Sequence, residues 1–572
     1  MSISSRPRKA PGRDWVVFSI TALISIAFVV WGFLDQSTLS TVSASAKDGV
    51  IKNLGWLFVF ASTGFVIFVL WLAASKYGRI PLGADGEKPE FRTHSWIAMM
   101  FSAGMGIGLM FFGVAEPLTY YVSPPPGTAD PETVEAFQTA MATTMFHWGL
   151  HPWAIYAVVG LAIGYGMYRK GRSQLLSAAF TSLFGDRANG PLGKVIDILA
   201  IFATLFGTAA SLGLGALQIG DGLEFAGWVG TVGTPVLVTI IVVLTFCFIL
   251  SAVSGVARGI QWLSNINMVL ALVLAVFVFV VGPTLLILNL LPSALGDYIQ
   301  QFVGMSKRTD ADGDAALAEW LSTWTIFYWA WWISWTPFVG LFIARISRGR
   351  TIRQFVSGVL LAPTIVSLVW FCVFGGAAIN RQHEFGDLAT GGEVESTGAL
   401  FALLDTMPWA GITAVIVMAL VGIFFVSGAD AASIVMGSLS ERGAHEPRRL
   451  TVVFWGALTG AVAAVMLVIG GGGDKALTGL QNLTILASVP FVIVMLMLCV
   501  ALYRDLRTDR MVLVEDRSSE LVERAVVIGE DKHGDHFDLV TRESAPDPVT
   551  PSDVMEEDRP DGEWTDTPTK ME

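Results

Sequence analysis

Long blocks of apolar residues recur along the chain and are separated by short polar segments. A transmembrane helix needs about 20 mostly apolar residues, so each block predicts one membrane span. The first block has full length and no small-residue cleavage site, and we expect a span there rather than a signal peptide. The pattern therefore predicts an all-α integral membrane protein. Its twelve spans are expected at residues 15–35, 54–74, 95–118, 141–167, 194–220, 233–254, 264–290, 318–345, 354–379, 411–438, 450–471 and 480–503.

The composition also indicates a membrane protein, and the charge distribution indicates an acidic C-terminal tail. Of the 572 residues, 53% are hydrophobic and only 15% are charged, whereas a soluble chain is about a quarter charged. The net charge of −12 belongs mostly to the C-terminal end, where Arg504 to Glu572 holds 20 acidic and 9 basic residues. We predict a short basic N-terminus at 1–14, a membrane domain at 15–503 and an acidic, partly disordered tail at 504–572.

Lysines and arginines in the short loops predict the orientation of the spans. They gather near the N-terminus and in every second loop, whereas the loops 119–138 and 221–232 contain none. Basic loops face the cytoplasm, so both termini are expected inside. The three cysteines, Cys247, Cys372 and Cys499, all lie in apolar blocks and are expected to be small buried side chains rather than disulfide partners or metal ligands.

Two spans carry signals of interruption. The third contains GMGIG, in which Gly104, Gly106 and Gly108 alternate with larger residues. Three glycines in five residues weaken a helix, although small residues also permit close helix packing. The eighth span, five spans later, contains Trp335-Thr336-Pro337 near its centre. Interrupted helices at matching places in two halves are typical of secondary transporters, and five spans per repeat gives repeats of spans 3–7 and 8–12.

Aromatic residues concentrate in the same eighth span, in YWAWWISW from Tyr328 to Trp335, and again in the fourth span. Such a stripe often only fills a core. It also suits an organic cation, because ring faces attract positive charge by roughly 0.5–2 kcal/mol per ring and bind quaternary ammonium groups in cages. Two aromatic clusters beside a broken helix therefore favour a transporter of a methylated cation or zwitterion.

These segments together resemble the betaine/choline/carnitine transporter family. The resemblance rests on GMGIG with FFGVAEPLTYY, FHWGLHPWAIYA, YWAWWISWTPFVGLFIARISRGRTIRQF and FFVSGADAAS, in order, over about residues 15–505. It implies a LeuT-like fold with a 5+5 inverted repeat and two extra N-terminal spans. It also implies a homotrimer in the bacterial cytoplasmic membrane, with no enzymatic activity, no cofactor and no nucleic-acid partner.

The resemblance further implies a site for a small solute, with glycine betaine favoured because Gly108 matches the betaine-type pattern. Sodium would be the coupling ion, although Gly428 stands where a serine is frequent. The implied substrate residues are Trp148, Trp153, Tyr156, Trp331, Trp332, Trp335, Met105, Gly104, Gly106 and Gly108, with Phe338 and Phe342 along the inward pathway. The implied ion-binding residues are Ser102, Met105, Phe424, Ser427, Gly428, Thr204, Thr208 and Phe338.

Several alternatives stay open at this stage. Thr204 and Thr208 have the spacing of hydroxyls bonded to their own helix. Asp430 is an acid inside a span, which fits either a proton relay in a proton-coupled choline, carnitine or ectoine transporter or a structural role at a helix break. Glu116 is expected to cap the third span. The pair His147 and His151 has the spacing of heme or metal ligands, so a membrane oxidoreductase is a distant alternative.

Overall fold

The computed structural model is helical throughout the part of the chain that it describes, where only two isolated β-bridges occur and no strand is found. It describes residues 12–540 except 105, 255–256, 313–314 and 471–473, and it leaves undescribed the side chains of 101–104, 254, 257–264, 312 and 474–475. The chain divides into two units, Met1–Asp509 and Arg510–Glu572. In the described residues of the second unit there is one helix, α19 (Arg510–His533).

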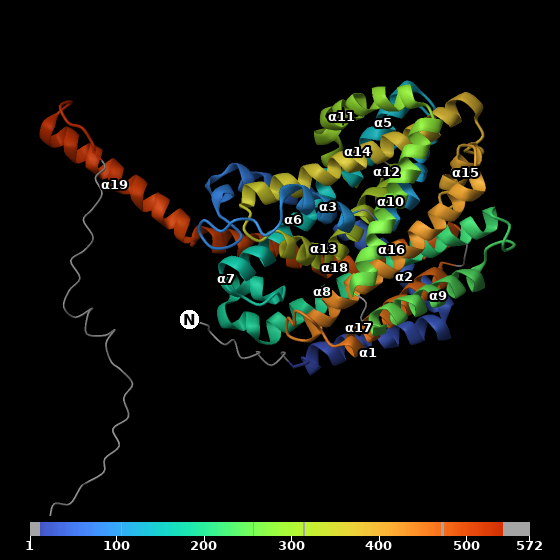
Figure 1. The fold of residues 1–572 in the computed structure, drawn as a ribbon, viewed down its shortest axis with the longest axis horizontal. Coiled ribbons are helices and arrows are strands. Elements are labelled where there is room, and N and C mark those ends of the chain that lie inside the picture. The colour runs from blue at the N-terminus through green and yellow to red at the C-terminus, as the bar shows by residue number, and fades with distance from the viewer. Residues whose placement is uncertain (1–11, 105, 255–256, 313–314, 471–473, 541–572) are drawn as a thin grey trace, which may run out of the picture. The chain divides into compact units, whose positions relative to one another are not determined.

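The first unit contains the predicted spans (Figure 1). Among the described residues, ten helices are long and apolar enough to cross a membrane, and the bent pair α10–α11 adds an eleventh. The shorter apolar helix α4, with α3 before it, lies where the third span is predicted. The helices are α1 (Trp15–Leu34), α2 (Gln36–Ala74), α3 (Thr93–Gly104), α4 (Ile107–Val122), α5 (Val134–Trp148), α6 (Leu150–Gly164), α8 (Pro191–Phe225), α9 (Thr234–Ser254), α10 (Ala257–Val281), α11 (Thr284–Ser306), α12 (Ala315–Leu321), α13 (Phe327–Ile346), α14 (Ile352–Phe385), α16 (Ala410–Ser440), α17 (Arg449–Ile469) and α18 (Asp474–Arg507). Shorter helices are α7 (Thr181–Phe184) and α15 (Ala399–Asp405).

The predicted break in the third span is confirmed. Helix α3 ends at Gly104 and α4 begins at Ile107, with Gly106 in an extended conformation at φ −151° and ψ −164°. Extended backbone inside a membrane domain is tolerated only where protein buries it or where it lines a cavity. The glycines therefore mark an interior position, in the middle of the bundle rather than at the lipid surface.

The predicted interruption at Trp335–Pro337 is wrong, because α13 runs without a break from Phe327 to Ile346. Proline removes the backbone donor that would bond to the carbonyl four residues earlier, which here belongs to Ile333. The hydroxyl of Thr336 donates to that same carbonyl at 2.7 Å and so replaces the lost bond. The irregular part of the eighth span lies earlier, in the π-helical turn η6 (Ser322–Ile326) that joins α12 to α13.

Two other spans are irregular. In the fourth span, α5 and α6 are separated at Gly149, because the ring of Pro152 conflicts with the carbonyl of Trp148 in a regular helix. The seventh span ends at Val281, earlier than the predicted residue 290, and the chain bends by 110° into α11.

Helix packing shows the two repeats directly. Helix α14 packs on α4 as α6 packs on α13, and α17 packs on α8 as α9 packs on α16. Likewise, α18 contacts α8 and α6 as α10 contacts α16 and α14. Each of these helix pairs in one repeat has an equivalent pair when spans 3–7 are matched in order to spans 8–12. Because each repeat has an odd number of spans, the second repeat crosses the membrane in the opposite direction, which gives the expected 5+5 inverted repeat.

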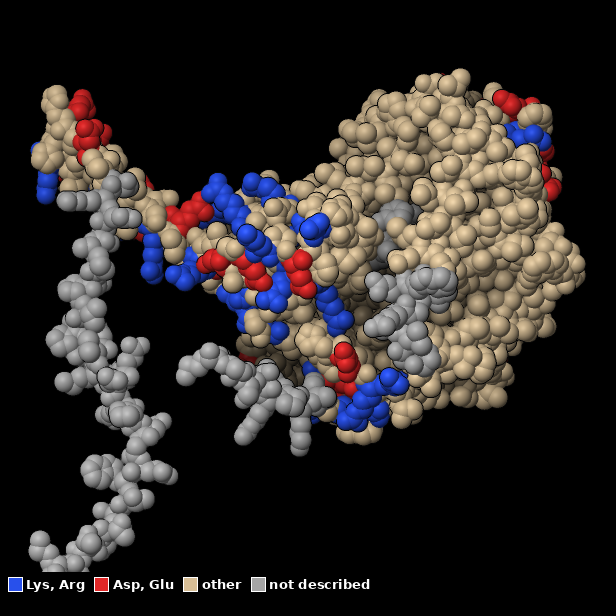
Figure 2. Space-filling view, in the orientation of Figure 1, with Lys and Arg blue, Asp and Glu red and all other residues tan. Residues whose placement is uncertain are grey.

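The basic loops share one side of the first unit. Arg169, after the fourth span, bonds to Asp85 between the second and third spans at 2.5 Å, and Arg348 after the eighth span bonds to Glu87 at 2.7 Å. On the face seen in Figure 2, the charged side chains of the first unit collect towards opposite edges of that unit and leave a broad uncharged surface between them. This distribution matches a protein whose middle lies in a bilayer.

Candidate functional site

The fourth and eighth spans bring the predicted aromatic residues together at the centre of the first unit. The rings of Trp148 and Trp332 lie 4.9 Å apart at 72°, and Tyr156 lies 6.4 Å from Trp332 at 79°. Trp153 extends the group through an edge contact with Tyr156 at 5.6 Å. All four side chains are at most 5% exposed. We call Trp148, Trp153, Tyr156 and Trp332 the aromatic cage.

The interrupted third span lies against this cage. A Cβ atom added to Gly108 would approach the indole of Trp331 to 2.7 Å and that of Trp148 to 2.8 Å. Gly106 is within 3.8 Å of Trp335 by the same measure. The break in span 3 therefore presents bare backbone to the tryptophans of spans 4 and 8. The side chains of Ser102 and Gly104, and the whole of Met105, lie outside the described residues.

The remaining predicted aromatics follow one face of α13. Trp331 stacks on Trp332 at 4.5 Å and lies 6.5 Å from Trp335, which in turn contacts Phe338 at 5.7 Å. Phe342, one turn further on, is half-buried. The stripe is thus continuous from the cage towards the end of α13 that carries Arg345, on the side of the basic loops.

Most ring donors around the cage are occupied, but two are not. Trp331 donates through its indole to the Ser211 hydroxyl of α8 at 3.1 Å, and Trp332 donates to the carbonyl of His147 at 3.1 Å. Among the described residues, the hydroxyl of Tyr156 and the indole nitrogen of Trp335 are buried without a protein partner. Buried polar groups are normally satisfied, so these two are available to a ligand or water.

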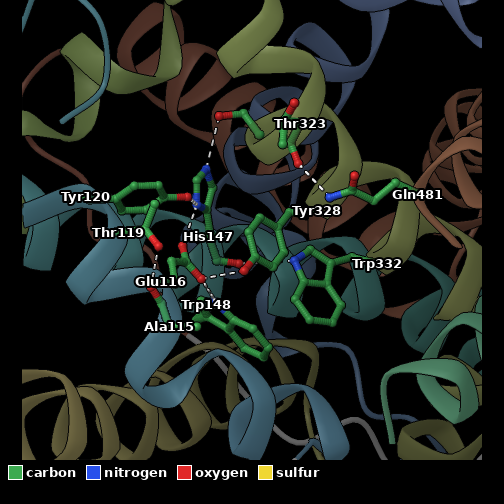
Figure 3. A network of polar contacts seen from close by, with 11 residues as sticks. Ala115, Glu116, Thr119, Tyr120, His147, Trp148, Thr323, Tyr328, Trp332 and Gln481 are labelled. Atoms are coloured by element: carbon green, nitrogen blue, oxygen red, sulfur yellow. Dashed lines mark hydrogen bonds and ion pairs between the residues drawn. The ribbon is translucent and has the colours of Figure 1, made fainter. Parts of the chain in front are cut away.

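A polar network not anticipated as part of the site adjoins the cage (Figure 3). The carboxylate of Glu116 accepts hydrogen bonds from the indole of Trp148 at 2.6 Å and from the hydroxyl of Tyr328 at 2.5 Å. It also meets Nδ1 of His147 at 2.8 Å, and the side chains of that pair are fully buried. Glu116 therefore lies inside α4 and does not cap it, which corrects the sequence-based expectation.

The sequence shows the residues of this network, but their spacing along the chain does not show that they meet. An acid and a histidine inside apolar spans are by default candidates for function, and His147 directly precedes Trp148. Tyr328, the first residue of the aromatic run in the eighth span, bonds to Glu116 and stacks on Trp332 at 5.8 Å. Both nitrogens of His147 have partners, with Thr325 at 3.0 Å from Nε2, and these contacts give it a place in the network.

The predicted ion-binding threonines lie on α8, against α13. Gly207, between them, has its Cβ position 2.3 Å from the Ser334 hydroxyl, so the two helices are in close contact at this level. Thr204 donates to the carbonyl of Ala200 at 2.8 Å, as its spacing allows. Thr208 is 2% exposed, and its hydroxyl is without a partner among the described residues. One hydroxyl oxygen is thus fully available to a hard cation.

The predicted ion-binding residues of the tenth span behave differently. Ser427 donates to the carbonyl of Ile423 in its own helix at 2.8 Å. Gly428 has open space at its Cβ position, and Phe424 is half-buried on the same helix. Asp430, 7% exposed, follows Ser427 by three residues and so lies on the same side of α16. The residues expected opposite them, Ser102 and Met105, lie outside the described part.

These features define a class of protein. Two inverted five-span repeats that enclose an aromatic site beside a broken helix form a secondary transporter. The family can be named as well: a family model for betaine/carnitine/choline family transporters matches residues 16–511, and the chain belongs to that family. It is accordingly a transporter and not an enzyme.

Two relatives of similar length support the family assignment. The betaine/ectoine transporter LcoP of Corynebacterium glutamicum is 45% identical over 528 residues, which cover 92% of this chain and 83% of the relative. The glycine betaine transporter OpuD of Bacillus subtilis is 46% identical over 497 residues, covering 87% and 94%. A solved sodium-coupled sialic acid symporter aligns at 14% identity and a TM-score of 0.40, over 77% of this chain and 86% of that one.

Proposed function

We propose that this protein is a secondary active symporter that imports glycine betaine or a closely similar methylated zwitterion by alternating access. The observation that carries the proposal is the aromatic cage, in which rings from the fourth and eighth spans meet around the bare backbone of Gly108. A trimethylammonium group has no N–H to donate and is attracted by ring faces. The names of the two relatives, a betaine/ectoine and a glycine betaine transporter, point to the same substrate class.

Sodium is proposed as the co-transported ion. The support is the buried, unpartnered hydroxyl of Thr208 beside Thr204, on a helix that packs against α13 near Phe338. Hydroxyl and carbonyl oxygens are the hard ligands that sodium takes. The second set, Phe424, Ser427 and Gly428 with Ser102 and Met105, is proposed on the family resemblance. Proton coupling through Asp430, with choline as substrate, is the alternative, and its support is the placement of that acid beside Ser427 on α16.

The experiment is uptake of labelled betaine into proteoliposomes under three conditions: an inward sodium gradient, an inward proton gradient and neither. We expect accumulation above the external concentration only with sodium. Accumulation driven equally well by protons alone would replace sodium coupling with proton coupling. Absence of betaine uptake, and of competition by betaine against choline, carnitine, ectoine or proline, would reject the substrate class.

We also propose a homotrimer in the bacterial cytoplasmic membrane with both termini inside, on the family resemblance and the shared side of the basic loops. Protease added outside intact cells should then leave the tail beyond Asp509 uncut. Crosslinking in the membrane should give a product of three chains. Cleavage of the tail from outside, or a crosslinked product limited to two chains, would contradict these proposals.

A further inference from the structure

The carboxylate of Glu116 joins three spans behind the aromatic cage. It lies on α4 in the third span and accepts from Trp148 of the fourth and Tyr328 of the eighth. His147 contacts it at 2.8 Å, and the backbone carbonyl of His147 holds the indole of Trp332. Three of the rings around the substrate position, Trp148, Trp332 and Tyr328, are thus oriented by one network (Figure 3).

The hydrogen bonds show which groups donate and which accept within this network. An indole N–H can only donate, so the oxygen of Glu116 that faces Trp148 accepts, as an ionised carboxylate does on both oxygens. Thr325 is 4% exposed and its hydroxyl contacts Nε2 of His147 at 3.0 Å. If the hydroxyl donates there, His147 is neutral with its proton on Nδ1 pointing at Glu116; if it accepts there, the same distances fit a protonated His147 paired with Glu116.

With a neutral His147, the carboxylate has no cation to balance it. No lysine or arginine forms an ion pair with Glu116 in the described part of the chain, and the other polar partners around it, Tyr120 among them through His147, are uncharged. A buried charge without a partner is costly in the resting protein. It is offset when a cation binds nearby, because charges interact strongly in a dry interior.

We propose that Glu116 supplies the negative charge that complements the quaternary ammonium group in the cage, acting as a positioning residue through Trp148. The hydrogen bond from the indole to the carboxylate fixes that ring and increases the electron density of its face, which strengthens the attraction for a cation. The inference rests on the proposed function of the cage. It adds a specificity determinant outside the residues that line the cage.

A comparison of choline with betaine distinguishes an effect of the Glu116 charge from an effect of cage geometry. Choline and betaine share the trimethylammonium group, but choline carries a net charge of +1, whereas the betaine carboxylate cancels it. The negative charge of Glu116 attracts the single positive charge of choline. In betaine it attracts the ammonium group and repels the carboxylate, so only the difference between these two interactions stabilises binding. Distortion of the cage, in contrast, weakens both through the group that they share.

The test measures inhibition constants of choline and unlabelled betaine against labelled betaine uptake in proteoliposomes. Glu116→Gln should raise the constant for choline on the order of tenfold more than that for betaine. Tyr328→Phe is the matched control, since it removes an uncharged hydrogen bond to the same carboxylate and should leave the ratio of the two constants unchanged. Glu116→Asp keeps the charge and should keep the ratio within about twofold of wild type, even if both constants rise.

Each outcome has a defined meaning. Equal factors for choline and betaine in Glu116→Gln would overturn the proposal and leave Glu116 as packing. Wild-type protein that transports betaine but is not inhibited by choline would also overturn it, because a negatively charged cage must bind a bare quaternary cation. If Glu116→Gln does not fold, a changed ratio in Glu116→Asp overturns the proposal and an unchanged ratio supports it. Wild type that binds neither solute rejects the proposed function itself.

Discussion

At the residue scale, Trp332 is a ring of the cage that is held on several sides. It stacks on Trp331, meets Trp148 edge-on and is fixed by its bond to the carbonyl of His147. Trp332→Leu keeps an apolar side chain but removes the ring, so we expect the KM for betaine to rise roughly 3- to 30-fold, the value of one cation–π contact. Uptake kinetics measure this. Trp455→Leu, a change of an equally buried indole on α17, should leave KM unaltered.

Gly108 offers a second test of the same site. The nearest atoms to an added Cβ are the outer ring carbons of Trp331 and Trp148, at 2.7 and 2.8 Å. Gly108→Ala must therefore displace both indoles, and we expect a several-fold higher KM for betaine. Gly64→Ala, also within a span but with open space around its Cβ position, is the matched substitution and should leave betaine KM near that of wild type. A normal KM in Gly108→Ala would place the substrate elsewhere.

Substitutions at Thr208 and Thr204 test sodium binding separately from protein stability. The Thr208 hydroxyl has no partner among the described residues, so Thr208→Val removes no protein hydrogen bond and should not lower the melting temperature. We expect it to raise the sodium concentration for half-maximal uptake at least several-fold. Thr204→Ser retains a hydroxyl and should behave as wild type. Identical sodium activation in Thr208→Val would remove that residue from the ion site.

At the scale of the element, the continuity of α13 depends on one hydroxyl. Thr336 donates to the Ile333 carbonyl that Pro337 leaves without its backbone donor. Thr336→Val leaves that buried carbonyl unsatisfied, at a cost of about 1–3 kcal/mol in the free energy of unfolding. Thermal unfolding in detergent should show a lower melting temperature. Thr336→Ser restores the donor and should recover most of the loss; if it destabilises equally, the methyl group is what matters.

Element packing also explains why the fourth and eighth spans can share a site. Gly340 of α13 and Gly160 of α6 lie against each other, with the Cβ position of Gly340 only 3.1 Å from the Gly160 nitrogen. Small residues allow two backbones to approach closely in a membrane. The close crossing fixes Trp153 and Tyr156 relative to Trp332 without a contribution from the loops.

At the scale of the whole molecule, the end of the twelfth span is fastened to the end of the fourth. Asp505 receives two hydrogen bonds from Arg172, at 2.5 and 2.8 Å, and Asp509 receives two from Arg169, both at 2.9 Å. Tyr165 donates to Asp509 as well, at 2.8 Å. These pairs lie at the side of the basic loops and connect elements more than 300 residues apart in the chain.

The Arg172–Asp505 pair is partly buried, at 17% and 7% side-chain exposure, so loss of one partner leaves a buried charge. We expect Arg172→Gln to lower the free energy of unfolding by as much as roughly 3–5 kcal/mol, and Arg172→Gln with Asp505→Asn to lose less than the sum of the single changes. Thermal unfolding measures both. Arg348→Gln breaks the exposed pair with Glu87 and should cost at most about 1 kcal/mol. Additive losses would show that the pair does not act as a unit.

The sequence by itself determined the spans, the broken third helix and the identity of the aromatic residues. Apolar length and glycine spacing are local properties, and a helix in a membrane satisfies its backbone within its own segment. That is why the twelve spans and the break between Gly104 and Ile107 agree with the structure.

Only the tertiary structure decided which side chains of different helices contact one another and which helices stay continuous. Thr336 keeps α13 continuous past Pro337, a compensation that depends on side-chain geometry. Glu116, His147 and Tyr328 come from three spans, and no spacing along the chain relates them. A buried carboxylate is stable only where separate helices bring donors to it, so its role became visible when the helices were packed.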